Sequence, residues 1–535
     1  MEFIDIIESY DFIPQRDKII ESINKPKDVY FRVNVLKDEE DRILEALSRY
    51  NIDFTKVDFV KGYYKLNPKN DFQIIELSKT PEHLFGFLYI QELSSAISID
   101  SLYKTISSDM VKFYENGNNQ ELVILDLCAS PGGKSILLID RFYRENKESL
   151  KNIIFILNDI GSRMKNLLAN ISRMGILNAI VTNCDARFFP KLNKDINLVI
   201  ADVPCSSESH VIDKMFYSPS KHPYFIHRIT KIQKDILKRA IYLTKKYVLY
   251  STCTFNLQEN EQIVNDIIAN EKNINLLKPI LDSNTLYEKG IIQYKEFTFN
   301  KQLENSIRIY PYHYNSGGIF FTIMEKEAKH NGIDQDYIRS IASFINLEEL
   351  SEILLIDNKF IYENYLSIFG IPFESVKDHI YFQKVKNQRK INLGGIELLK
   401  DDIYVTLVKK FLRKDKGPLK VESFGIKAFR FFKPLNQFKI TSNFLSILSK
   451  YITKNYLSLK FDLSLLIDFL CRKKIEKNSE NFEDIRIDNN AYPYVAIKFN
   501  KLTIGCALNY KDYIISEIPS TKANFFLSTI KPMNQ

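Results

Sequence analysis

The sequence has no tryptophan, and its six cysteines include no CxxC pair. The missing tryptophan excludes no function by itself. A disulfide framework is typical of small secreted chains, and a zinc site needs ligands in close pairs. We therefore expect no metal site, and any cysteine with a function should act as a reactive thiol. The cysteines are Cys128, Cys184, Cys205, Cys253, Cys471 and Cys506.

Long apolar runs are also missing, because no stretch approaches the roughly 18 uninterrupted apolar residues of a membrane-spanning helix. The first residues, MEFIDIIESYDFIPQRDK, lack the basic and apolar regions of a secretory signal. We therefore expect an intracellular protein without a membrane partner. The net charge of +8 is compatible with a polyanionic partner, but many lysine-rich proteins carry such a charge for solubility.

Apolar runs alternate with helical patterns from about residue 121 onward, which predicts an α/β domain with a mainly parallel sheet. Ligands of such a sheet collect at the carboxyl ends of its strands. The expected strands are residues 121–127, 152–159, 179–185, 196–203 and 247–253.

The segment LDLCASPGGKS (125–135) joins the first of these strands to a helix. Its two glycines allow a ligand to approach the backbone, and a helix N-terminus offers free N–H groups. It is neither a Walker A loop nor GxGxxG, so ATP and NAD are disfavoured. Asp159 and Asp185 end the next two strands, where a carboxylate can bind a ribose or an adenine edge, although Asp185 is also a plausible helix cap.

Cys205 and Cys253 follow the two remaining strands, in ADVPCSSESH and YSTC. A single such cysteine is more often a small buried hydrophobe. Two such cysteines, beside Asp202 and the loop at 125–135, favour a catalytic role for the thiols over a buried structural one. A thiolate that adds to cytosine C6 makes C5 nucleophilic, an acid near N3 stabilises the adduct, and a base then removes the C5 proton.

The segments LDLCASPGGKS, NDIGSRMKNLLANISRMG, DVPCS and YSTCTFNLQENE resemble the ordered motifs of the Sun/Fmu type RNA cytosine-5 methyltransferases. FRVN (31–34) and GFLYIQELSS (86–95) resemble the upstream motifs of that family, with Glu92 where Asp is usual. TNCDARFFP (182–190) and RIYPYHYNSGGIFF (308–321) are similar to the eukaryotic multisite tRNA methyltransferase branch. The resemblance covers roughly residues 1–326.

The resemblance implies a Rossmann-like class I methyltransferase that uses S-adenosyl-L-methionine. It assigns Cys253 as the nucleophile, Cys205 as the cysteine that releases the product, and Asp202 as the acid that holds the cytosine. It also places Lys134 among the catalytic residues. It also implies a cofactor site formed by Cys128, Ala129, Ser130, Pro131, Gly132, Gly133, Lys134, Asp159, Arg163, Asp185 and Asp202.

One segment departs from this pattern. After DVPCS the branch continues Gly-Asp/Glu-Gly-Thr, whereas this chain reads Ser207-Glu208-Ser209-His210. Serine disfavours positive φ, so we expect a changed loop and leave the target choice open. His210 is expected to face solvent rather than the base.

Four regions are expected: an N-terminal α+β RNA-binding domain (1–104), the methyltransferase domain (105–328), an intermediate region (329–416) and a PUA-like α+β region (417–535). Basic clusters in the third region are candidates for phosphate contacts or for an ordinary solvated face. An aromatic run at 429–432 is more typical of core than of base stacking. The basic candidates are Lys384, Lys386, Arg389, Lys390, Lys409, Lys410, Arg413 and Lys414.

We therefore expect a monomeric tRNA (cytosine-5-)-methyltransferase, in the nucleus rather than the cytoplasm. Ribosomal RNA is the alternative substrate. A DNA cytosine-5 enzyme is disfavoured, since that class uses the cysteine of its Pro-Cys motif and has no need of a second thiol. A non-catalytic RNA-binding factor that kept the fold remains an alternative, supported only by the altered loop.

Overall fold

The computed structural model places most of the chain. It describes residues 3–23, 25–115, 122–145, 153–192, 195–210, 223–327, 354–356, 358–377, 379–384, 389–393, 396–400, 404–409, 420–432, 437–487 and 492–530. Within these ranges no helix is long and apolar enough to cross a membrane.

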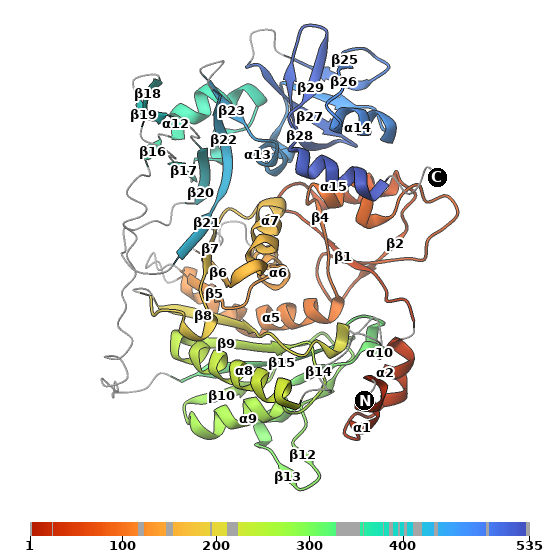
Figure 1. Cartoon of the computed structure of the whole chain (residues 1–535), viewed down its shortest axis with the longest axis vertical. Helices are drawn as coiled ribbons and strands as arrows, with labels where there is room; N and C mark the ends of the chain where they lie inside the picture. The colour runs from red at the N-terminus through yellow and green to blue at the C-terminus, as the bar shows by residue number, and fades with distance from the viewer. Residues whose placement is uncertain are drawn as a thin grey trace.

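A central sheet organises the middle of the chain (Figure 1). Its strand order is β11-β14-β15-β9-β8-β5-β6-β7-β21, and the strands from β7 to β9 run parallel. The parallel strands are β5 (Leu122–Asp126), β6 (Ile153–Asp159), β7 (Ala179–Asn183), β8 (Ile196–Asp202) and β9 (Thr244–Thr252). The antiparallel ones are β10 (Ile274–Leu277), β11 (Glu288–Lys289), β14 (Ile307–Ile309), β15 (Ile319–Lys326) and β21 (Lys420–Phe424). This arrangement confirms the predicted mainly parallel α/β domain.

Helices cover both faces of the sheet. α5, α6 and α7 share one hydrophobic core with alternate residues of the strands, and α8 and α9 share the core on the other face. β5 and β6 are buried along their whole length because both faces are covered. The helices are α5 (Leu93–Glu115), α6 (Gly133–Glu145), α7 (Met164–Met174), α8 (Pro223–Leu243) and α9 (Glu261–Asn270).

The N-terminal region contains a four-stranded antiparallel sheet of order β2-β3-β1-β4, as an α+β domain requires. The boundary expected at residue 104 falls inside α5, since this helix leaves the small sheet and packs on α6. The elements are β1 (Tyr30–Val33), α3 (Glu40–Ser48), β2 (Phe54–Val57), β3 (Tyr63–Leu66), α4 (Pro81–Leu84) and β4 (Leu88–Ile90). α1 (Phe3–Ser9) and α2 (Arg16–Ile23) pack instead on Phe255 and Tyr310.

The C-terminal region forms a five-stranded sheet, β16-β17-β20-β22-β23, and a six-stranded sheet, β25-β29-β28-β27-β24-β26. The PUA-like assignment stays a prediction. The strands are β16 (Leu354–Ile356), β17 (His379–Lys384), β20 (Tyr404–Lys409), β22 (Ile426–Phe432), β23 (Gln437–Ile440), β24 (Tyr456–Leu459), β25 (Ile475–Glu476), β26 (Phe482–Arg486), β27 (Tyr494–Phe499), β28 (Leu502–Asn509) and β29 (Tyr513–Ser516). The helices are α12 (Asn358–Ile361), α13 (Ser442–Ile447), α14 (Leu463–Leu470) and α15 (Ser520–Ile530), and the remaining pairs are β12 (Gln293–Tyr294) with β13 (Phe297–Thr298) and β18 (Arg389–Leu393) with β19 (Ile396–Lys400).

Two findings concern residues that follow the expected boundary at 417. β21 pairs with β7, so it extends the methyltransferase sheet rather than a separate domain. Phe429 is fully buried in a hydrophobic core. This agrees with the expectation that the aromatic run is part of a core rather than a surface for base stacking. Gly417, Pro418, Lys386, Lys410, Arg413 and Lys414 lie outside the described residues, and Lys384, Arg389, Lys390 and Lys409 lie in strands whose side chains are not described.

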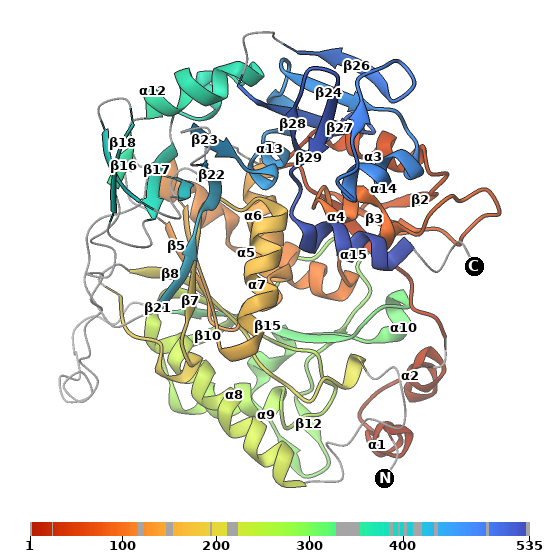
Figure 2. The same cartoon turned by 45° about the horizontal axis from the view of Figure 1, so that its top comes forward.

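The N-terminal sheet and the C-terminal six-stranded sheet lie side by side (Figure 2). They share one hydrophobic core, in which Phe31 and Leu47 accompany Leu457 and Val495. We call this contact the seam. Buried polar groups cross it: Asn500 Nδ2 donates to the carbonyl of Ala46 at 2.7 Å and to Glu82 Oε1 at 2.9 Å. The region at each end of the chain therefore stabilises the other.

Candidate active site

The carboxyl ends of β5, β8 and β9 open into a cleft of about 630 Å³, closed on one side by β4 and the start of α5. Most of the predicted site residues line it. These are Ala129, Ser130, Pro131, Gly133, Lys134, Arg163, Asp202, Cys205 and Cys253.

The two cysteines meet in this cleft. β8 and β9 are parallel neighbours with Asp202 opposite Ser251, so the residues that follow each strand emerge side by side. The Cys205 and Cys253 sulfurs lie 2.9 Å apart, and neither cysteine is part of a disulfide. The hydrogen bond with Cys253 and burial raise the pKa of Cys205 well above its usual range. Cys205 is therefore held as a thiol.

Lys134 and Asp202 form an ion pair beside the thiols, with 2.8 Å between Nζ and Oδ2. Ser251 Oγ donates to the other carboxylate oxygen of Asp202 at 2.6 Å. Burial lowers the pKa of Lys134, but the attraction of Asp202, with a smaller one from Cys253, outweighs it and raises the pKa overall. A permanent ammonium near Cys253 favours a thiolate there rather than on Cys205.

The cofactor loop between β5 and α6 is held from beneath by two carboxylates. Ser130 N donates to Asp159 Oδ2 at 2.8 Å, and Cys128 N donates to Asp126 Oδ1 at 3.2 Å. Gly132 has a φ of +104°, which lets the chain turn into the helix. A Cβ added at Gly133 would lie 3.2 Å from Gln91 Nε2, so glycine keeps this part of the cleft open.

The structure therefore places Asp159 and Cys128 behind the loop rather than on the cleft surface. Asp185 also lies off this surface: it caps a short 3₁₀ helix and pairs with Arg187 at 2.7 Å, which lowers its pKa. Asp185 is therefore a helix cap in the structure. The contact of Asp185 with an adenine stays a prediction. Arg163 donates to the carbonyl of Ser130 at 3.1 Å, and Arg32 is buried against Asp140 in the domain contact.

Sequence reasoning missed part of the lining. Tyr89, Gln91 and Glu92 come from the N-terminal domain, and Gly318 comes from the turn before β15. Sequence reasoning also gave Asp126 no role in the site. Asp126 ends a strand as Asp159 does, and this position could have indicated it. Burial, reinforced by the charge of Asp202, raises the pKa of Asp126 to about 7.

The lining fits S-adenosyl-L-methionine. The lining includes three acids, Glu92, Asp126 and Asp202, and two cations, Lys134 and Arg163. Such an excess of acid suits a ligand with a sulfonium and an ammonium group. The neighbouring loop, with its two glycines before a helix N-terminus, suits a nucleoside or a carboxylate.

The altered loop after Cys205 is well anchored. Ser207 adopts a φ of +59°, the left-handed conformation that serine disfavours, and its side chain is exposed at the cleft. Glu208 is 2% exposed, and its carboxylate accepts from Phe255 N and Asn256 N. Ser207 therefore adopts the left-handed conformation without a glycine, at a cost in backbone strain. The side chain of His210 is outside the described part.

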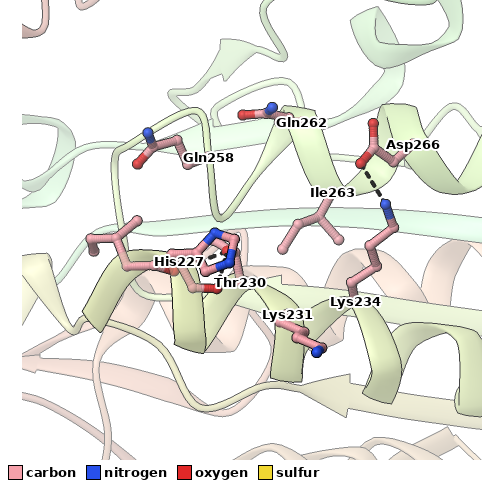
Figure 3. A pocket seen from close by; sticks show the side chains of 9 residues that line it. His227, Thr230, Lys231, Lys234, Gln258, Gln262, Ile263 and Asp266 are labelled. Carbon is pink, nitrogen blue, oxygen red and sulfur yellow. Dashed lines mark hydrogen bonds and ion pairs between the residues drawn. The ribbon is translucent and has the colours of Figure 1, made fainter. Parts of the chain in front are cut away.

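A second cavity, of about 520 Å³, lies between α8 and α9 and shares no lining residue with the cleft (Figure 3). Most of its lining residues have polar side chains, and its Lys234 and Asp266 neutralise each other at 2.7 Å. It contains no thiol and no group of the predicted chemistry, so we assign the reaction to the first cleft.

A family model described as 16S rRNA methyltransferase RsmB/F matches residues 114–325. A human 28S rRNA (cytosine(4447)-C(5))-methyltransferase is 26% identical over 58% of this chain and 36% of its own length. Ribosomal RNA small subunit methyltransferase F of Pectobacterium carotovorum is 28% identical over 61% of this chain and 62% of its own length. The chain thus spans only part of these relatives.

Solved structures are similar at lower identity. A Pyrococcus horikoshii protein named NSun6, crystallised with SFG, is 17% identical and covers 61% of this chain and 98% of its own length, with a TM-score of 0.48. The expected cofactor, S-adenosyl-L-methionine, is confirmed by the methyltransferase family of the matched segment. The relatives named above are rRNA enzymes, so the expected tRNA branch is not supported by them. By the family model and the curated relatives, the α/β domain is similar to RNA cytosine-5 methyltransferases of the Sun family.

Proposed function

We propose that this protein methylates C5 of cytosine in RNA through a covalent intermediate on Cys253. The observation that carries the proposal is the pair of sulfurs 2.9 Å apart, beside the Lys134–Asp202 ion pair in one cleft. A single reactive thiol would fit many chemistries. Two thiols with an acid and a fixed cation fit addition to a pyrimidine and its reversal.

The first step uses Cys253, whose sulfur adds to C6 of the cytosine. The electron pair of the C5–C6 double bond then becomes available at C5. Asp202, fixed by Lys134 and Ser251, would hold the N3 and N4 edge of the base, and a proton shared between its carboxyl group and N3 would neutralise the negative charge that develops at N3. Bound S-adenosyl-L-methionine supplies an electrophilic methyl group for C5.

The second step removes the methylated base from the enzyme. A base takes the C5 proton, the electron pair of that C–H bond restores the C5–C6 double bond, and the C6–S bond breaks with its pair returning to Cys253. Cys205 lies at the leaving sulfur and, through this position, would promote the release. It lies next to an anionic leaving group, to which its S–H can donate.

RNA is the proposed partner. Two kinds of observation bear on the class of RNA, and they favour different classes. The segments at 182–190 and 308–321 favour tRNA, whereas the printed names of the relatives favour rRNA. A cytosine in a folded RNA must be splayed out of its stack to reach the cleft. The N-terminal and C-terminal regions would hold the phosphates, and we propose a monomer that acts in the nucleus.

The test is methyl transfer from labelled S-adenosyl-L-methionine to unmodified tRNA and rRNA transcripts. Wild type should methylate cytosine C5 in one class, and Cys253→Ala should abolish transfer. Cys471→Ala is the matched control, because this free cysteine is exposed and far along the chain from the cleft. No transfer to either RNA by a protein that binds the cofactor would overturn the proposal in favour of a non-catalytic RNA-binding factor.

A further inference from the structure

The two segments that carry the cysteines are tied together by buried carboxylates. We call residues 203–210 the Cys205 loop and residues 253–260 the Cys253 loop. Each loop supplies one glutamate whose carboxylate accepts hydrogen bonds from the other loop. Glu208 and Glu259 are 2% and 0% exposed, so neither carboxylate is solvated.

Glu259 holds the Cys205 loop. Its carboxylate accepts from Ser206 N at 3.0 Å and from Ser206 Oγ. Gln233 of α8 donates to Glu259 Oε2 at 2.7 Å and to the carbonyl of Pro204 at 2.9 Å. The residues on both sides of Cys205 are therefore fixed through this carboxylate.

Glu208 holds the Cys253 loop in return. Its Oε2 accepts from Phe255 N at 2.6 Å and from Asn256 N at 3.1 Å. Its Oε1 accepts from Asn256 Nδ2 at 3.0 Å and from Tyr10 Oη, just after α1, at 2.9 Å. Four donors thus saturate one buried carboxylate, which needs them because it has left water.

Asn256 joins the two halves. Its Nδ2 also donates to Glu259 Oε1 at 2.7 Å, and its Oδ1 accepts from Glu259 N at 2.8 Å. Ser209 N donates to the carbonyl of Cys253 at 3.1 Å. The separation of the two sulfurs is therefore set by a closed network rather than by the flexible side chains themselves.

We propose that Glu208 is a positioning residue that keeps Cys205 beside the sulfur of Cys253 while the base is bound. The proposal rests on the proposed function and concerns its second step. Addition to C6 needs only the sulfur of Cys253, whereas release needs Cys205 in place as the C6–S bond breaks. Loosening the network should therefore slow release more than addition.

Glu208→Gln tests this directly. The amide keeps the shape of the side chain but replaces one acceptor oxygen with an NH2 donor. This new donor would face the groups that donate to the carboxylate of Glu208 in the wild type. We expect turnover to fall about tenfold or more, with covalent RNA–protein adduct accumulating on a denaturing gel, as we also expect for Cys205→Ala. The affinity for S-adenosyl-L-methionine should stay unchanged, and Glu208→Asp should restore part of the release.

Glu82→Gln is the matched control, because Glu82 is an equally buried carboxylate in the seam. It should lower stability without adduct. Tyr10→Phe removes only one hydrogen bond to Glu208 and keeps the ring that stacks on Phe12, so it folds and should show a smaller accumulation of adduct.

The outcomes separate the two proposals. If Cys205→Ala traps no adduct and wild type transfers no methyl group, the proposed function itself is wrong. If wild type is active and Cys205→Ala traps adduct, but Glu208→Gln and Tyr10→Phe accumulate none, only the positioning role of Glu208 is wrong. A loss of turnover in Glu208→Gln that matches a loss of folded protein, without adduct, also overturns it.

Discussion

Two buried lysines show how the cleft and the seam differ. Lys134 in the cleft pairs with Asp202, and this attraction raises its pKa. Lys37 at the seam donates to the carbonyl of Phe85 and to Ser446 Oγ, and burial, with the nearby charges of Lys522 and Arg173, lowers its pKa well below the usual range. The cleft thus retains a charge that chemistry requires, whereas the seam accommodates an amine by weakening its charge.

The largest expected effect sharpens this comparison by deleting each amine. Lys134→Met removes the cation that holds Asp202 and that favours a thiolate on Cys253, so turnover should fall on the order of 10²-fold or more. Lys37→Met should leave turnover per folded molecule unchanged, because its amine contacts only neutral groups of the seam. Single-turnover methyl transfer at saturating cofactor measures both. Equal losses in the two variants would contradict a division between a catalytic and a structural lysine.

The next effect concerns the seam alone. Asn500→Ala removes the buried amide that donates to the carbonyl of Ala46 and to the carboxylate of Glu82, so the free energy of unfolding should fall by about 1–3 kcal/mol. Urea unfolding measures the change, and the folded variant should keep its turnover. A variant with full stability would show that water replaces the amide and that the seam is less closed than its burial indicates.

The sequence predicts the cleft better than the seam for a physical reason. Cys205, Cys253 and Asp202 directly follow parallel strands, and the ends of such strands converge whatever the rest of the chain does. Asn500 and Glu82 lie 418 positions apart, and no local pattern relates them. The sequence also predicts the cleft incompletely where its lining depends on packing between regions. Tyr89, Gln91 and Glu92 reach the cleft only after the N-terminal sheet has packed on α6.

A smaller effect concerns the acid that ends β5. Asp126 is protonated below its pKa of about 7 and ionised above it, and a cationic ligand favours the ionised form. The affinity for S-adenosyl-L-methionine should therefore rise as the pH increases through 7, by up to about tenfold between pH 6 and 8. Calorimetric titration across this range measures it. Asp126→Asn should bind more weakly and without this slope, so an unchanged slope in the variant would assign it to another group.

The smallest effect compares backbone strain in the two regions. Ser207 in the cleft and Lys501 in the seam both have positive φ, at +59° and +68°. Glycine removes the steric cost of this conformation but adds entropy to the unfolded chain, so each substitution should raise the free energy of unfolding by at most about 1 kcal/mol. Urea unfolding of Ser207→Gly and Lys501→Gly measures this gain.

The two variants should then part in activity. Lys501 lies in the turn between β27 and β28, where its ammonium pairs with Glu45, and it does not line the cleft, so Lys501→Gly should leave methyl transfer unchanged. Ser207 stands between Ser206 and Glu208, which are both anchored, and its hydroxyl lies 4.0 Å from the sulfur of Cys205. Strain that persists next to reacting groups is usually retained for a use. Ser207→Gly should therefore change turnover or the choice of RNA while it stabilises the fold, and a variant that gains stability with no change in either would mean that the serine in this loop is only tolerated.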